Sequence, residues 1–372
     1  MAKLKYYDIR HLINKYPEAH YYMAIGERSN GKTYSAMDYC LENYFTKGEQ
    51  FVYLRRFAED VKPKRLTQLF AAHIDTGSVG RHSGGQYSSI KYQRNMFFPV
   101  FVPNDEDFEP VVSQEPAGFA FDLNSMEHNK SISYPKVTTI VFDEFLSREG
   151  YLPGEFLLLM NTISTIVRSR DNVKIIMLGN TVNRFCPYFT EMGLYNIKNQ
   201  KQGTVDIYKY GETGLQVVVE YCAYTGKGAK ASTVYFAFKN PQLQMITTGA
   251  WEIAVYPRLT TKYRPKDVQF EVFFQFDEAI LHGELVCTDE QYFMFIHPKT
   301  TPIKEETEDI VYCDHPDQRW NWKFRLTKQS DKISTWIQKM VKENRVFYSD
   351  NETGEVFRNY LIWSDTYNPK RG

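Results

Sequence analysis

The chain has 372 residues, which exceeds the size of a single hydrophobic core, so two domains are expected. Its 42% hydrophobic and 24% charged residues are typical of a soluble globular protein, and no run approaches the ~18 apolar residues of a membrane span. Forty-five basic and forty-five acidic residues cancel, which excludes a whole-molecule field that recruits nucleic acid but not a local basic patch. The five cysteines are widely spaced and indicate reduced thiols, so we expect an intracellular protein without a membrane partner.

A phosphate-binding loop is the first predicted feature. Residues 26–33 fit the pattern G-x-x-x-x-G-K-[ST] and lie between an apolar run at 21–25 and a segment with helical periodicity. Backbone N–H groups of such a loop point at phosphate oxygens, and the helix N-terminus favours negative charge. We expect Lys32 to hold the β- and γ-phosphates of ATP and Thr33 to ligate Mg²⁺. The predicted cofactor-binding residues of the loop are Gly26, Arg28, Gly31, Lys32 and Thr33.

Two further strands follow, at 51–54 and 137–142, and the second ends at Asp143 and Glu144. Its unbroken apolar run is typical of a parallel strand buried on both faces, and ligands bind at the carboxyl ends of such strands. Asp143 is suited to supporting Mg²⁺ and Glu144 to polarising the attacking water. The Glu beside the Asp favours a hydrolase over a small-molecule kinase.

The next elements are a helix whose first turn includes Pro153 and whose apolar positions run to Val167, then a buried strand at 173–178. Asn180 follows that strand. The carboxyl ends of parallel strands share one edge of the sheet, so Asn180 should lie with Lys32 and Glu144, where it could sense the γ-phosphate or orient the water.

Arg168 and Arg170 lie between this helix and this strand, at the opposite edge of the sheet from their own nucleotide. One interpretation is an arginine finger that acts on a neighbouring subunit, which requires a ring with nucleotides at its interfaces. The other is that both residues complement the helix dipole. The position of the two arginines alone slightly favours the interpretation that they complement the helix dipole.

The remaining chain is less specific. Basic and aromatic residues around the Gly- and Ser-rich stretch 75–89 suit either a nucleic-acid contact or a solvated insertion. We predict a P-loop domain at 1–194, a linker at 195–235, and a β-rich α+β domain at 236–372 with a helix around 332–344. We expect no catalytic chemistry in this second domain and no metal-ligand cluster among its histidines, which are His282, His297 and His315.

The first 190 residues resemble the DNA-packaging ATPases of small tailed phages of the phi-29 type, which belong to the additional-strand, catalytic-glutamate P-loop class. The resemblance rests on residues 26–33, 48–56, 134–145, 168–170 and 180–189. It implies an ATP-driven homomeric ring, with five subunits expected, on the portal vertex of a procapsid in the host cytoplasm. The resemblance further implies that this ring would drive double-stranded DNA inward, with a structural RNA as a possible further partner.

The resemblance also implies individual roles. The family's trans-acting finger falls on Arg168, with Arg170 close by, and a second basic residue proposed to act between subunits falls on Lys130. The family's C-terminal domain is similar to an RNase H-type nuclease without its acidic site. Two alternatives stay open: a ring helicase or conjugative-type translocase on free DNA, and a P-loop protein that uses nucleotide only as a switch or assembly cue.

Overall fold

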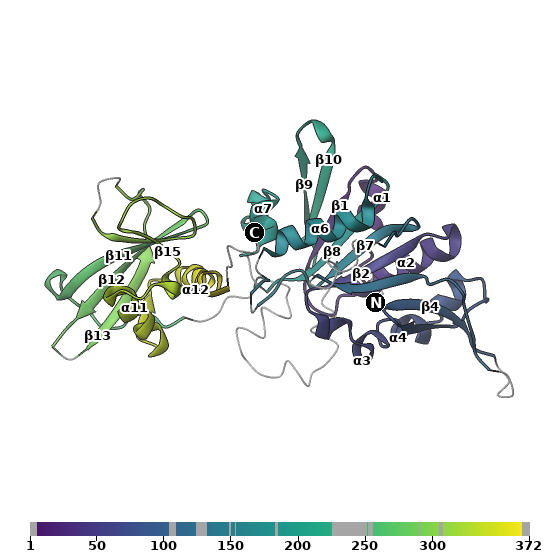
Figure 1. Ribbon diagram of the computed structural model, residues 1–372, viewed down its shortest axis with the longest axis horizontal. Helices are drawn as coiled ribbons and strands as arrows, with labels where there is room; N and C mark the ends of the chain where they lie inside the picture. Colours follow the sequence, from purple (N-terminus) through teal and green to yellow (C-terminus); the bar gives the residue numbers. More distant parts are fainter. Residues whose placement is uncertain are drawn as a thin grey trace. The chain divides into compact units, whose positions relative to one another are not determined.

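The computed structural model describes residues 6–103, 109–123, 132–148, 150–152, 154–182, 185–224, 251, 256–289, 291–304 and 308–366. The chain divides into two compact units, Met1–Arg148 with Glu155–Glu252 and Glu149–Gly154 with Ile253–Gly372 (Figure 1). Among the described residues, no helix has both the length and the apolar character needed to cross a bilayer.

The first unit is built on a ten-stranded sheet in the order β3-β4-β6-β2-β7-β8-β1-β10-β9, with β5 paired to β4. The six central strands, from β6 to β10 in this order, are parallel, and β3, β4, β5 and β9 pair antiparallel at the margins. The strands are β1 (Tyr21–Gly26), β2 (Gln50–Arg55), β3 (Ser89–Gln93), β4 (Met96–Phe101), β5 (Val111–Val112), β6 (Gly118–Asp122), β7 (Val137–Asp143), β8 (Lys174–Asn180), β9 (Thr204–Tyr210) and β10 (Leu215–Tyr221). The predicted parallel-sheet core is therefore confirmed.

Helices of this unit connect the strands and pack on the sheet. The α-helices are α1 (Arg10–Lys15), α2 (Lys32–Lys47), α3 (Pro63–Leu66), α4 (Ala71–Asp75), α5 (Ser78–His82), α6 (Glu155–Val167) and α7 (Pro187–Glu191). Short 3₁₀ helices are η1 (Ala58–Val61), η3 (Tyr195–Lys198) and η4 (Gly211–Thr213). Every residue of β1 is buried, as expected for a central strand covered on both faces. The predicted first-turn residue Pro153 lies outside the described residues.

The predicted boundary between the domains requires a correction. Strands β9 and β10 fall inside the segment 195–235 that we predicted to be a linker, yet β10 pairs in parallel with β1, with Met23 opposite Val219. Val217, Val218 and Val219 are buried. Their burial extends the sheet beyond β1, so the first unit continues well past residue 194.

The second unit is a six-stranded sheet in the order β15-β14-β11-β12-β13-β16. Strands β11, β12 and β13 form an antiparallel meander, and β14, β15 and β16 add in parallel. Rings of α12 contact Phe274 of β11, so this helix covers one face of the sheet. The elements are η5 (Pro265–Asp267), β11 (Val268–Phe276), β12 (Ala279–Cys287), β13 (Tyr292–Pro298), β14 (Ile310–Cys313), β15 (Trp322–Phe324), η6 (Leu326–Lys328), α11 (Lys332–Lys342), β16 (Val346–Tyr348) and α12 (Asn351–Thr366).

The structure confirms the predicted helix near 332–344, and the Asp331 carboxylate caps it by accepting a hydrogen bond from the Ser334 N–H at 3.1 Å. The expectation that the histidines form no cluster is wrong for two of them. The antiparallel register of β12 and β13 sets His282 directly opposite His297. That register depends on strand pairing, which spacing along the chain does not show. The assignment of this unit as RNase H-like stays a prediction.

Candidate nucleotide site

The loop between β1 and α2 has the conformation that its sequence predicts. Gly31 has φ 98° at the start of α2, a left-handed value that favours glycine. The Lys32 ammonium is buried inside the loop, where Nζ donates to the Glu27 carbonyl oxygen at 2.6 Å and to Asn30 Oδ1 at 3.2 Å. It also lies 3.4 Å from Asn180 Oδ1. The Lys32 ammonium thus directs to these three oxygens the N–H donors that phosphate oxygens would use.

Gly26 is needed because another strand approaches it closely. A Cβ at this position would lie 2.9 Å from the Cβ of Cys222, just beyond β10, and the Cys222 N–H donates to the Ile25 carbonyl oxygen at 2.7 Å. The loop therefore rests directly against the end of β10. Arg28 is exposed on the outside of the loop.

Asp143 lies at the carboxyl end of β7 and joins the loop to the central sheet. Its Oδ2 accepts hydrogen bonds from Thr33 Oγ1 and from the Tyr53 hydroxyl, each at 3.0 Å, and its Oδ1 accepts from the Glu144 N–H at 3.0 Å. Burial raises the pKa of Asp143, and the nearby Arg55 guanidinium opposes that shift. A buried carboxylate bonded to a threonine hydroxyl is an oxygen donor set that fits Mg²⁺.

Glu144 follows at once, with φ 57° and an exposed side chain. A left-handed glutamate is strained, and such strain concentrates at functional sites. Its Oε2 lies 2.5 Å from the Arg55 guanidinium at the end of β2. Both residues line a pocket of about 320 Å³ with Tyr53, Asp60 and Leu66 among its walls.

Sequence reasoning assigned no role to Tyr53 or Arg55. A signal existed, because residues 51–54 are predicted as a strand of the same parallel sheet and Arg55 follows them, so the rule that placed Asn180 puts Arg55 on the same edge. Which residue Arg55 meets there depends on the strand order, in which β2 pairs with β7 and Leu54 lies opposite Phe142.

A buried ion pair supports the segment that carries Glu144. Arg56 Nε donates to both carboxylate oxygens of Glu155, at 3.0 and 2.8 Å, and its two terminal nitrogens donate to the carbonyl oxygens of Glu144 and Phe145, at 3.1 and 2.6 Å. The Tyr188 hydroxyl donates to the same carboxylate at 2.5 Å. Arg56 therefore fixes the backbone carbonyl groups of Glu144 and Phe145.

The two arginines after α6 have different surroundings. Arg170 donates to five backbone carbonyl oxygens, those of Tyr134, Pro135, Val137, Ile166 and Val167. This links the end of α6 to the start of β7. Arg168 is exposed, has φ 52°, and donates to the Ile132 carbonyl oxygen at 3.0 Å.

Both arginines precede β8 and so lie at the opposite sheet edge from Asn180, as predicted. The structure does not bring either of them to the nucleotide site of its own chain. Lys130 lies outside the described residues.

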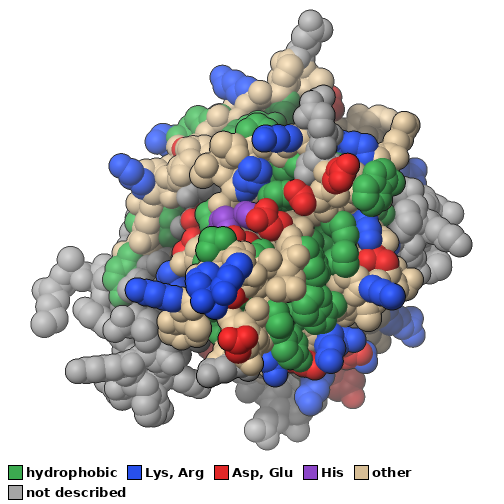
Figure 2. Space-filling model, turned by 90° about the vertical axis from the view of Figure 1, so that its left-hand side faces the viewer, with side chains coloured by type: hydrophobic (Ala, Val, Ile, Leu, Met, Phe, Trp, Pro, Cys, Tyr) green, Lys and Arg blue, Asp and Glu red, His purple; other side chains and the backbone are tan. Residues whose placement is uncertain are grey.

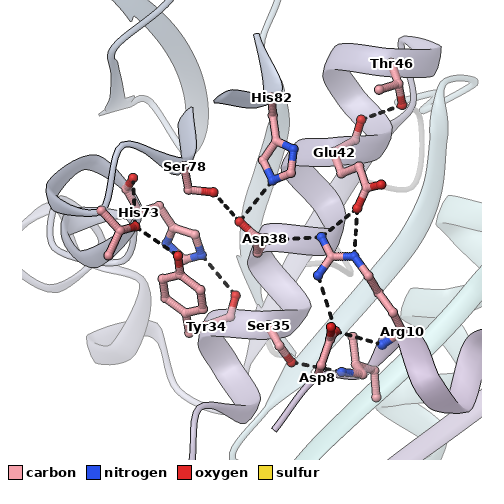
Figure 3. Close-up of polar contacts among 12 residues, drawn as sticks. Asp8, Arg10, Tyr34, Ser35, Asp38, Glu42, Thr46, His73, Ser78 and His82 are labelled. Carbon is pink, nitrogen blue, oxygen red and sulfur yellow. Dashed lines mark hydrogen bonds and ion pairs between the residues drawn. The ribbon is translucent and has the colours of Figure 1, made fainter. Parts of the chain in front are cut away.

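The helix that follows the loop is anchored along its length, as Figure 3 shows. Asp38 Oδ2 accepts from the Arg10 guanidinium at 2.8 Å, and Asp38 Oδ1 accepts from the Ser78 hydroxyl and lies 3.1 Å from His82 Nε2. Arg10 belongs to α1, and Ser78 and His82 belong to α5. One carboxylate of α2 thus ties together the two helices on either side of it.

Comparisons with known proteins find similarity to phage DNA packaging proteins. The family model described as Podovirus DNA encapsidation protein (Gp16) matches residues 108–210. The DNA packaging protein of Bacillus phage B103 is 30% identical over 173 residues, which is 46% of this chain and 47% of that protein. The corresponding protein of Bacillus phage phi29 is 29% identical over 185 residues, 49% of each. The matched region thus spans about half the length of these relatives.

Solved structures extend the likeness of fold over nearly the whole chain. The bacteriophage Phi-29 viral genome packaging motor assembly matches with a TM-score of 0.52 at 20% identity, over 95% of this chain and 99% of that one. The Phi-28 gp11 DNA packaging motor matches with a TM-score of 0.52 at 18% identity, over 97% and 98%. The resemblance expected from the sequence is confirmed: this chain has a mixed α/β fold with a parallel-sheet core and is similar to the DNA packaging proteins of phi29-type phages.

Proposed function

We propose that this chain is an ATPase that drives double-stranded DNA into a procapsid. One observation carries the proposal: Lys32, Thr33, Asp143 and Glu144 meet at one sheet edge in a chain similar to phage DNA packaging proteins. Neither half of that observation is sufficient, because P-loops serve many functions and sequence similarity covers about half the chain.

Each residue at this edge would have a different role in ATP hydrolysis. Lys32 would exchange its contacts with Glu27 and Asn30 for phosphate oxygens of ATP. Thr33 and Asp143 would hold Mg²⁺, whose charge would offset that of the transferring phosphoryl group. The Arg55 ion pair must release Glu144 before that carboxylate can orient the attacking water.

We infer that the site is completed by a neighbouring subunit. Arg168 is the better finger because its side chain is exposed, whereas Arg170 is engaged by five backbone carbonyl oxygens. A ring of identical chains, five by the resemblance, would present each Arg168 to the next nucleotide. By the resemblance, Lys130 would act at the same interface.

The ring would act in the host cytoplasm at the portal vertex of the procapsid, with a structural RNA as a possible further partner. The second unit, if RNase H-like, would serve for docking or for gripping DNA.

A packaging assay tests this function. Wild-type protein, ATP, Mg²⁺, cognate procapsids and double-stranded DNA should give DNA protected from nuclease, with ATP turnover that depends on procapsids. Glu144→Gln should bind ATP but neither turn it over nor protect DNA. Turnover that is retained by Glu144→Gln, or that responds to free DNA but not to procapsids, would overturn the proposal.

A further inference from the structure

The second unit contains a group of side chains of the types that bind metal ions. His282 and Glu284 are two residues apart on β12 and therefore point to the same face of the sheet, and His297 lies opposite His282 on β13. One ring nitrogen of each histidine and one carboxylate oxygen of Glu284 lie within 4.8 Å of one another. All three side chains are partly buried.

These side chains are on the face of the sheet away from α12. Helix α12 packs on Phe274, which points to the opposite face from Phe273, and the Phe273 ring lies 4.9 Å from the His282 ring. Each of the three side chains keeps part of its surface exposed, so a metal ion could reach the group from solvent. Figure 2 shows the surface of the protein with its histidine side chains in purple and its acidic side chains in red.

Neighbouring groups orient two of the three side chains for metal binding. His297 Nδ1 lies 3.2 Å from the Pro298 carbonyl oxygen, which fixes the proton on Nδ1 and leaves Nε2 as a lone-pair donor. The Tyr263 hydroxyl donates to Glu284 Oε2, which leaves Oε1 available. Metal ligands in proteins are held in this way by a backbone carbonyl or a hydroxyl in the outer sphere.

Glu271 adds a second carboxylate beside the group. Its Oε2 lies 3.1 Å from the buried Nε2 of His282. Two ligand atoms on a tetrahedral zinc ion, each at about 2.0 Å, lie roughly 3.3 Å apart. The spacing of this pair therefore suits two groups that face one cation, and two carboxylates offset its double charge.

We propose that His282, Glu284 and His297 bind a divalent transition-metal ion, with Glu271 beside them as a further oxygen donor. Two imidazoles with carboxylate oxygens favour Zn²⁺ over the harder Mg²⁺ of the nucleotide site. The ion would join β12 to β13 on the face of the sheet away from α12. The site is independent of ATP hydrolysis, and no step of the proposed motor cycle passes through it.

Zinc titration of the untagged full-length chain, freed of metal and without nucleotide, tests the site. Competition with a chromophoric chelator should show one zinc ion per chain. His282→Asn with His297→Asn should abolish this binding, and Glu284→Gln should weaken it at least tenfold. Tyr263→Phe removes only the outer hydroxyl and should weaken it by about 10–100-fold.

Two matched variants serve as controls. His315→Asn removes a histidine that pairs with Asp314 instead, and Cys287→Ser removes the exposed thiol at the end of β12. Both control variants should bind zinc with the affinity of the wild-type protein. In addition, zinc should raise the melting temperature of wild type and of these controls but not of the double histidine variant.

Equal zinc affinity in wild type and in Glu284→Gln would overturn the proposal, even if the double variant fails to fold. Absence of saturable binding by wild type would overturn it as well.

Discussion

Loss of Glu155 should destabilise the protein and stop ATP turnover. The side chains of Arg56 and Glu155 are 6% and 0% exposed, and their ion pair supports the backbone at Glu144 and Phe145. Glu155→Leu removes the partner of a buried guanidinium that cannot release its proton. Arg56→Met is milder, because the stranded carboxyl group can be protonated.

The magnitude follows from the burial of the pair. Removing one partner of a buried ion pair costs about 3–5 kcal/mol of unfolding free energy. In a unit of this size each kcal/mol lowers the melting temperature by about 2–4 °C, so Glu155→Leu should lower it by roughly 6–20 °C. Replacing both partners with apolar residues is far less costly, because no unpaired charge stays buried.

Calorimetry and ATPase assays on four proteins separate the two effects: wild type, Glu155→Leu, Arg56→Met, and the double variant. The double variant should recover at least half of the stability lost in Glu155→Leu. Its ATP turnover should stay low at a temperature where all four are folded, because the carbonyl groups of Glu144 and Phe145 lack their donors.

The exposed ion pair of Lys62 with Glu59 provides the control, and Glu59→Ala should change the unfolding free energy by less than about 1 kcal/mol. The reasoning is refuted if Glu155→Leu is no more destabilising than Glu59→Ala. It is also refuted if the double variant is as unstable as Glu155→Leu or hydrolyses ATP normally.

Two further predictions concern the phosphate-binding loop and its helix. Gly26→Ala should lower the affinity for ATP, measured by fluorescent-nucleotide titration, because the added methyl group would clash with Cys222. Gly80→Ala is the control and should bind ATP normally, because its Cβ would have no neighbouring atom closer than 3.9 Å. Equal ATP affinities of the two variants would contradict the prediction. Burial would raise the pKa of Asp38, but hydrogen bonds, including one from Arg10, outweigh burial and lower that pKa. The ionised carboxylate therefore stabilises the folded protein above the unfolded pKa of about 3.9. This stabilisation is lost as the pH falls through the pKa of the folded state. Asp38→Asn should therefore flatten the fall in melting temperature below about pH 4, and an unchanged slope would count against this assignment.

Much of the candidate nucleotide site could be predicted from the sequence because its determinants are local. The loop at Gly26 to Thr33 needs only its own residues and the strand and helix on either side. Asp143 and Asn180 could be placed because the carboxyl ends of parallel strands share an edge. The structure brings Lys32, Thr33, Asp143 and Asn180 together as this rule requires.

The features that escaped prediction depend on pairing between distant segments. Arg55 reaches Glu144 only because β2 lies beside β7. Strand β10 belongs to the first sheet because it pairs in parallel with β1. The contact of His282 with His297 depends on the register of one strand pair. None of these follows from periodicity, which describes an element but not its neighbour.

Complementation between two inactive variants tests the central claim, a site shared by adjacent subunits. Arg168→Ala retains Lys32 and Glu144 but lacks the finger, whereas Glu144→Gln retains the finger. If Arg168 acts in trans, mixed rings regain hydrolysis wherever a Glu144→Gln subunit presents its Arg168 to an Arg168→Ala neighbour. Random mixing at equal amounts would restore at most about one quarter of wild-type ATPase activity.

The control mixes Lys32→Ala with Glu144→Gln, whose defects lie in the same half of the site, so no recovery is expected at any ratio. The account predicts a maximum of activity near equal amounts for the Arg168→Ala and Glu144→Gln mixture only. Activity that never exceeds the sum of the two separate variants would contradict a shared site.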